Sequence, residues 1–119
     1  MSLSVLETAT YVAEIANNKK AYDVQILDIR GLSGIADYFV ICSGNSETQV
    51  QAITNEIKEK IDEVGMPIKG IEGNQQARWV LIDLGDVIVH VFHKEDRDYY
   101  KLERLWADAP RIVLEEKQV

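Results

Sequence analysis

This sequence of 119 residues has few of the residues that make cross-links or metal clusters. Its only cysteine is Cys42, which excludes an intramolecular disulfide and a thiolate metal cluster. The apolar run around Cys42 predicts a buried, unreactive thiol. No apolar run approaches the ~20 residues that a membrane-spanning helix needs, and the first residues show neither a secretory signal nor an Arg-rich transit segment. These absences predict a cytoplasmic protein without membrane contact.

Basic side chains are scarce as well. The chain has 13 lysines and arginines against 20 aspartates and glutamates, which gives a formal net charge of −7. Direct nucleic-acid binders carry a basic surface, so this balance argues against nucleic acid and favours a basic protein as partner. The length and the hydrophobic content of 46% fit one globular domain with one core.

What the sequence does contain is a clear alternation of helix and strand patterns. Capping-box pairs mark two helix starts, Ser4 with Glu7 and Ser46 with Gln49. The predicted elements are a helix over 1–18, a strand over 23–29, a buried strand over 38–42, a helix over 46–64, a short edge strand over 67–71, a hairpin over 78–93 and a last helix over 95–109. They predict a single α/β domain over 1–110, a small mixed sheet with helices packed on it, followed by a charged tail over 111–119.

The hairpin over 78–93 is the most informative part of this pattern. It turns at Leu84-Gly85, and its second strand is apolar on both faces, which predicts a covered position in the middle of the sheet. His90 and His93 lie three apart on this strand and point to opposite faces, so they cannot share a metal ion. We therefore interpret His90 as a hydrogen-bonded strand histidine and predict no metal site.

Three stretches resemble the ribosomal silencing factor family, also called the Iojap-like family. They are Trp79–Ala109 (WVLIDLGDVIVHVFHKEDRDYYKLERLWADA), Ala36–Ser46 (ADYFVICSGNS) and Ile71–Gly73, and the matches keep their order from about Leu6 to Ala109. The resemblance implies a fold akin to nucleotidyltransferase domains. It also implies binding to the large ribosomal subunit through its ribosomal protein fourteen, which sterically blocks joining of the small subunit and lowers translation when nutrients are scarce. Organelle relatives assist large-subunit assembly, so a biogenesis factor using the same surface is an alternative.

The nucleotidyltransferase comparison raises a second alternative, a nucleotide-binding enzyme. Gly44-Asn45-Ser46 forms a strand-to-helix junction of the type that receives phosphate. Such enzymes also need paired carboxylates on a strand to hold Mg²⁺, whereas Asp83 and Asp86 straddle a turn. We therefore predict no catalytic residues and no cofactor, and we interpret the junction as a helix cap.

The candidate site is a surface of aromatic and acidic side chains, which is the composition of a protein interface. The predicted partner-binding residues are Trp79, Glu72, Asp83, Asp86, Tyr99 and Tyr100. By resemblance, Trp79 matches a tryptophan that contacts the partner in relatives. The alternatives are a structural hairpin with a solvated acidic tip, and packing of the last helix on the sheet by Tyr99 and Trp106, which we prefer for Trp106. Such a surface could also form a homodimer in the free protein.

Overall fold

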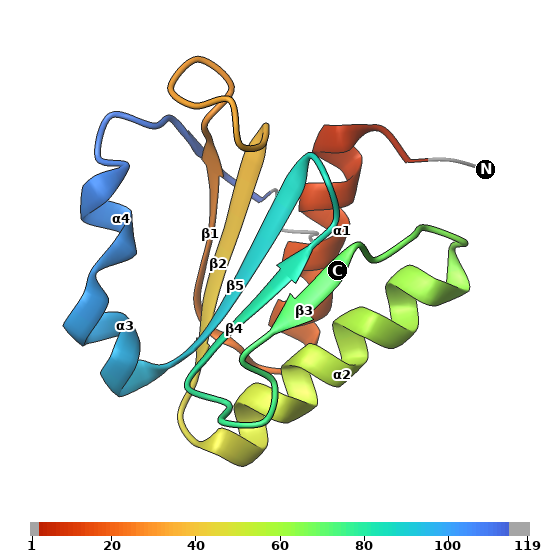
Figure 1. Ribbon diagram of the computed structural model, residues 1–119, viewed down its shortest axis with the longest axis vertical. Helices are drawn as coiled ribbons and strands as arrows, with labels where there is room; N and C mark the ends of the chain where they lie inside the picture. The colour runs from red at the N-terminus through yellow and green to blue at the C-terminus, as the bar shows by residue number, and fades with distance from the viewer. Residues whose placement is uncertain (1–2, 115–119) are drawn as a thin grey trace.

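The structure is a computed structural model that describes residues 3–114, and in this part of the chain six strands form one sheet (Figure 1). The strand order is β3-β4-β5-β2-β1-β6. The elements are α1 (Val5–Asn18), β1 (Tyr22–Asp28), β2 (Tyr38–Gly44), α2 (Glu47–Glu63), β3 (Gly70–Glu72), β4 (Trp79–Asp83), β5 (Val87–His93), α3 (Lys94–Tyr100), α4 (Leu102–Leu105) and β6 (Arg111–Ile112). The predicted mixed α/β sheet is confirmed.

The two central strands, β2 and β5, are the parallel pair of the sheet. Val40 lies opposite Val89 in their register, and all seven residues of each strand are buried. Each other pair of neighbouring strands is antiparallel, including the predicted β4–β5 hairpin. Gly85 has a φ of 92°, a conformation that favours glycine, at the turn of this hairpin. The predicted central position of the second hairpin strand is therefore confirmed.

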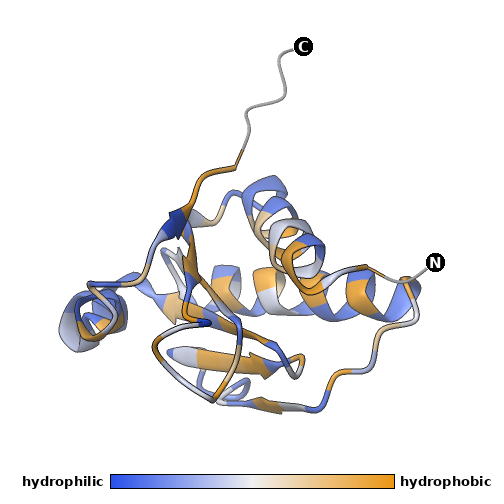
Figure 2. Ribbon diagram, turned by 90° about the horizontal axis from the view of Figure 1, so that it is seen from above, coloured by the Kyte–Doolittle hydropathy of each residue, from blue (hydrophilic) through white to orange (hydrophobic). Residues whose placement is uncertain are grey.

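Helices cover the two faces of the sheet unequally (Figure 1). α1 and α2 lie on one face and, with the strands beneath them, enclose the larger core, which includes Val12, Ile57 and Val89. Figure 2 shows apolar residues interleaved with polar ones along both helices, as expected for helices with one buried side. On the other face α3 and α4 form a smaller core around Phe39 and Leu102.

Side chains at the helix starts explain where α1 and α2 begin. The Ser4 hydroxyl accepts the Glu7 amide at 3.1 Å and the Glu7 carboxylate accepts the Ser4 amide at 2.8 Å, so the first predicted capping box is present. In α2 the Ser46 hydroxyl accepts the Gln49 amide at 3.1 Å. The Gln49 side chain, however, accepts from the amide of Asn45 at 2.6 Å, so only half of the second box forms.

The prediction of one continuous helix over 95–109 is wrong. Lys101 has a φ of 50°, which ends α3, and the short α4 follows in a new direction. The turn brings Leu102 into the smaller core and leaves Tyr99 in solvent, so burial of a leucine overrides helical periodicity. Tyr99 thus does not pack this segment on the sheet. Trp106 does pack this segment on the sheet, which is the interpretation we preferred for it, because its ring lies edge-on to the ring of Phe39 with centroids 5.3 Å apart.

Two shorter segments differ from the sequence pattern. The predicted strand over 67–71 begins at Gly70, although it lies at the sheet edge as expected for a proline-containing segment. The predicted tail over 111–119 begins inside the sheet, because Arg111 and Ile112 pair with β1. Residues 115–119 of that tail lie outside the described residues. None of the helices within residues 3–114 is long and apolar enough to cross a membrane.

Candidate functional site

The candidate site lies on the sheet face opposite α1 and α2, where α3 and α4 leave β4 uncovered. Side chains alternate along a strand, so Trp79, Leu81 and Asp83 share this face of β4. Trp79 and Leu81 are only partly buried and form the margin of the smaller core. This face therefore offers apolar side chains that α3 and α4 cover only in part.

Trp79 is held in place on three sides. Its ring stacks on Phe92 of β5 with centroids 4.8 Å apart, and Tyr100 of α3 lies 4.9 Å away. Its indole Nε1–H donates to Nδ1 of His90 at 3.1 Å. An aromatic ring that is fixed before binding loses little conformational freedom when a partner arrives, which suits an interface anchor.

His90 lies beneath this tryptophan and is 4% exposed. Burial disfavours its charged form and lowers its pKa from 6.5 to about 4, so the imidazole is neutral near pH 7. A neutral imidazole can accept at Nδ1, which is the bond that Trp79 makes, and the prediction of a hydrogen-bonded strand histidine is confirmed. Its Nε2 is buried without a hydrogen-bond partner among the described residues.

His93 has a different role at the end of the same strand. It is the N-cap of α3, and its Nδ1 accepts the amide of Glu95 at 3.2 Å. In residues 3–114 no group of three or more His, Cys, Asp or Glu side chains could hold a metal ion. Cys42, in β2, is buried, and burial raises the pKa of its thiol to about 12. The buried thiol agrees with the sequence interpretation of Cys42.

Tyr99 and Tyr100 extend the surface outward from Trp79. They are 80% and 49% exposed, and their rings meet edge-on at 5.0 Å. The three side chains Trp79, Tyr99 and Tyr100 therefore form one contiguous group, called the aromatic surface below. The structure brings together all three of the predicted aromatic residues.

The three predicted acidic residues are more scattered. Glu72 is exposed and pairs with Leu81 across β3 and β4, so it lies on the same face as the aromatic surface. Asp83 shares this face, but its carboxylate accepts the Gly85 amide at 2.8 Å and belongs to the turn. Asp86 lies at the hairpin tip, where it lines a small cavity with Val5 at the start of α1. The structure therefore separates Asp86 from the aromatic surface.

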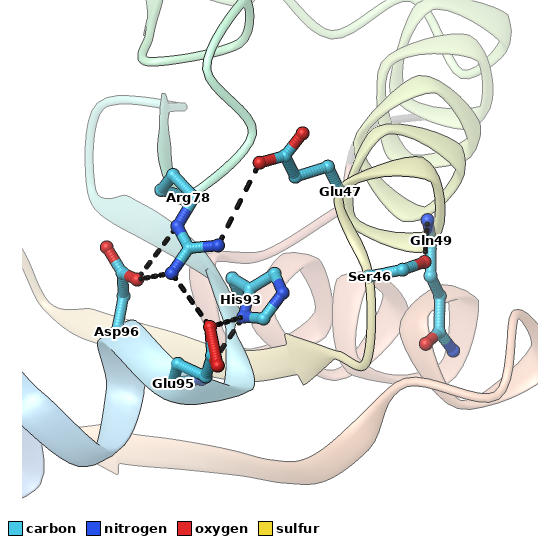
Figure 3. A network of polar contacts seen from close by, with 7 residues as sticks. All are labelled: Ser46, Glu47, Gln49, Arg78, His93, Glu95 and Asp96. Atoms are coloured by element: carbon cyan, nitrogen blue, oxygen red, sulfur yellow. Dashed lines mark hydrogen bonds and ion pairs between the residues drawn. The ribbon is translucent and has the colours of Figure 1, made fainter.

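Sequence reasoning missed Arg78, which precedes Trp79 and organises a polar network (Figure 3). Its guanidinium contacts Asp96 at 2.7 Å, Glu95 at 3.1 Å and, more distantly, Glu47 at 3.8 Å. Hydrogen bonds to Glu95 and Asp96 raise the pKa of Arg78. The network joins the start of β4 to the first turn of α3 and so helps to place Tyr100 near Trp79. The sequence signal for this network was the adjacent acidic pair Glu95 and Asp96 at the start of the predicted last helix, which could have been expected to attract a basic side chain.

The junction at residues 44–46 is explained by packing. A Cβ added to Gly44 would lie 3.0 Å from the backbone N and 3.1 Å from Cγ2 of Val50. Glycine therefore lets the first turn of α2 pack closely against the end of β2, and Ser46 caps the helix. This supports the interpretation of the junction as a helix cap.

The fold and this surface define a small α/β domain that presents aromatic side chains on the uncovered half of a sheet face. The chain belongs to a particular family of that kind, the ribosomal silencing factors. A family model described as ribosomal silencing factor during starvation matches residues 2–119.

Relatives of known sequence and structure agree with this assignment. The chain is 56% identical over 112 residues to the ribosomal silencing factor RsfS of Bacillus subtilis, covering 94% of this chain and 92% of that protein. It resembles a crystal structure of a Chromobacterium violaceum protein with a TM-score of 0.86 and 32% identity, over 98% of this chain and 92% of the other. A more distant relative is mouse mitochondrial assembly of ribosomal large subunit protein 1, 26% identical over 80% of this chain and 43% of that protein.

Proposed function

We propose that this protein is a translational repressor that binds the large ribosomal subunit and blocks joining of the small subunit. Its contact on the large subunit would be ribosomal protein fourteen, at the face that meets the small subunit. Membership of the ribosomal silencing factor family supports this proposal. It would act in the cytoplasm, where subunits join, and lower translation when nutrients are limiting.

The observation that carries the proposal is the aromatic surface. Tryptophan and tyrosine dominate binding energy at protein interfaces, and they do so best at well-packed positions surrounded by less critical contacts. Trp79 is packed in this way between Phe92 and Tyr100, while Tyr99 extends into solvent. Trp79 is therefore our proposed anchor, and the two tyrosines are its neighbours in the interface.

Charge would steer the approach to a basic ribosomal protein. The chain has a formal net charge of −7, and Glu72 is exposed beside the aromatic face. Complementary charges speed association and orient partners, and they do so less well at high salt. Asp83 and Asp86 would contribute through this wider field, since neither adjoins Trp79 as Tyr100 does.

Occupancy of the subunit-joining face would be the whole mechanism. Steric exclusion requires no catalytic residue and no cofactor, and the family is named for silencing of ribosomes rather than for a reaction. We accordingly propose that the protein is not an enzyme. In the free protein the same apolar surface could pair with a second copy, and such a homodimer would compete with ribosome binding.

Co-sedimentation with purified large and small subunits tests this proposal. We expect the wild type to pellet with the large subunit alone, and Trp79→Ala and Tyr99→Ala to remain largely in the supernatant. Tyr99 is 80% exposed, so its variant separates lost contact from lost folding. Leu6→Ala is the matched control, because Leu6 is 42% exposed on α1, across the sheet.

Two results would contradict the proposal. One is a wild type that pellets with neither subunit, and the other is a Tyr99→Ala variant that binds as well as Leu6→Ala. Light scattering of mixed subunits then measures whether bound protein prevents their joining. Failure to prevent joining by a protein that does bind would refute the steric mechanism.

A second candidate function is large-subunit assembly, which the name of the mouse relative favours. It would use the same surface, so binding experiments cannot distinguish it from silencing. Deletion of the gene separates the two, because an assembly factor predicts accumulation of immature large subunits during rapid growth. A silencing factor predicts normal subunits and excess translation during starvation.

A further inference from the structure

The aromatic surface depends on two helices that are too short to be stable alone. α3 has seven residues and α4 has four, and Lys101 between them has a left-handed φ of 50°. Isolated helices shorter than about 12 residues are marginal in water. Contacts with the sheet must therefore hold Tyr99 and Tyr100 beside Trp79.

Arg97 of α3 makes several of these contacts, and it is only 6% exposed. Its Nη1 donates to the main-chain oxygens of Asp23 at 2.7 Å and Tyr22 at 3.3 Å, both in β1. The same Nη1 donates to the Ser43 hydroxyl of β2 at 2.9 Å. One guanidinium therefore joins α3 to two neighbouring strands.

Two carboxylates compensate the charge of Arg97. Its Nε donates to Oε1 of Glu103 at 2.6 Å. Its Nη2 lies 3.2 Å from Oδ2 of Asp23, an ion pair whose geometry makes no hydrogen bond, so Nη2 lacks a hydrogen-bond partner among the described residues. A buried charge without partners is strongly unfavourable, so the arrangement is stable only while both carboxylates stay close. Glu103 belongs to α4, and its bond to Arg97 therefore spans the turn at Lys101.

We propose that Arg97, with Glu103, is a positioning residue for the aromatic surface. It clamps α3 and α4 onto β1 and β2, and it thereby fixes the tyrosines relative to Trp79. Arg97 is not itself part of the aromatic surface, because its guanidinium is mostly buried and contacts β1, β2 and α4, whereas Trp79 lies on β4, beyond β5. This inference rests on the proposed function, since the surface that it positions is the one that would bind the large subunit.

The side-chain chemistry explains why arginine serves here. A planar guanidinium offers five donors in fixed directions, whereas lysine concentrates its donors at one nitrogen. A lysine at position 97 could not reach Glu103, Ser43 and the β1 carbonyl groups together. Arg97→Lys therefore keeps the positive charge and removes the clamp.

The test combines a ribosome-independent measurement with binding. In the free protein, NMR measures the contact between the rings of Trp79 and Tyr100, and it reports separately on the core under α1 and α2. Affinity for the purified large subunit is then measured for the same variants. Arg104→Lys is the matched control, because Arg104 is an exposed arginine on α4 that makes no ion pair with another described residue.

We expect Arg97→Lys to lose the Trp79–Tyr100 contact, to retain the larger core and to bind about tenfold more weakly, because the surface is no longer preorganised. Glu103→Gln should show the same changes to a smaller extent, and it carries the test if Arg97→Lys does not fold. Arg104→Lys should resemble the wild type throughout.

Two outcomes overturn the inference. In the first, a clamp variant keeps the Trp79–Tyr100 ring contact, whatever its affinity for the large subunit. In the second, a clamp variant loses the ring contact and still binds like the wild type. If the wild type binds no large subunit, the proposed function fails. The ring contact in the free protein then still decides whether Arg97 positions the aromatic surface.

Discussion

The two faces of β5 use the same strand in different ways. Val87, Val89 and Val91 point toward α1 and α2 and are enclosed in the larger core. On the other face His90 and Phe92 are equally buried, but Trp79, which is itself only half buried, helps to cover them. One face is thus closed by helices, while part of the other is closed by aromatic side chains that remain available to a partner.

The residues on one face of β5 stabilise the fold, while those on the other face support the surface that we propose binds a partner. Successive residues of a strand alternate between faces, so neighbouring positions can serve distinct purposes without disturbing the backbone. The helix-covered face needs only shape and apolar area. The aromatic face also needs directed polar contacts, such as the bond from Trp79 to His90, because its side chains must keep one orientation while partly in water.

The largest effect that we expect is on the helix-covered face. Ile57 of α2 is fully buried, so Ile57→Ala should lower the free energy of unfolding by about 2–5 kcal/mol through lost burial and a residual cavity. Leu105→Ala removes a similar side chain that is 77% exposed, and it should change stability by less than about 0.5 kcal/mol. Urea denaturation compares the two variants. Similar losses would contradict the assignment of the main core to this face.

A pH effect should arise on the aromatic face. The folded-state pKa of His90 is about 4, below its ordinary value of 6.5, so the unfolded chain binds more protons between these values. The resulting stability is fully present above pH 6.5 and is lost as the pH falls through 4. It amounts to about 3 kcal/mol. Urea denaturation from pH 4 to 7 should give a flatter profile for His90→Gln than for the wild type, and parallel profiles would disprove this role of His90.

A smaller effect should follow from removing one donor. Trp79→Phe keeps an aromatic ring on Phe92 but leaves the buried Nδ1 of His90 without its partner. We expect a loss of about 1–3 kcal/mol in the free energy of unfolding, the usual penalty for an unsatisfied buried acceptor. Denaturation of this variant in the His90→Gln background provides the control, where the loss should shrink. An equal loss in both backgrounds would exclude the hydrogen bond as its cause.

Much of the fold followed from short-range patterns in the sequence. Continuous apolar runs identified β2 and β5 as central strands, and Ser4 with Glu7 marked the start of α1. The break at Lys101 had no such signal, because no glycine or proline stands near it. The contacts that accompany the turn are tertiary, namely burial of Leu102 and the bond from Arg97 to Glu103. The pairing of Ile112 with β1 could not be predicted from the sequence either, since a two-residue strand shows no hydrophobic periodicity.

The aromatic surface was more predictable than its polar surroundings. Trp79, Tyr99 and Tyr100 are large residues in recognisable motifs, and the structure places them together. Asp86 was grouped with them because it is acidic and lies in a motif of the resemblance, yet it lies at the hairpin tip and lines a cavity with Val5 of α1. Arg97 could not be recognised, because its partners in β1 and β2 are more than fifty residues away along the chain.

The short outer strands have a consequence for how the protein behaves at high concentration. An exposed sheet edge with free amide and carbonyl groups is a template on which another extended chain can assemble into aggregates. Here one edge is β3, with three residues, and the other is β6, with two. Each edge strand therefore has few backbone groups with which another chain could pair. Arg111 and Ile112 also cover the edge of β1 at Ile26 and Leu27, so a chain truncated before them should aggregate more readily than the full sequence.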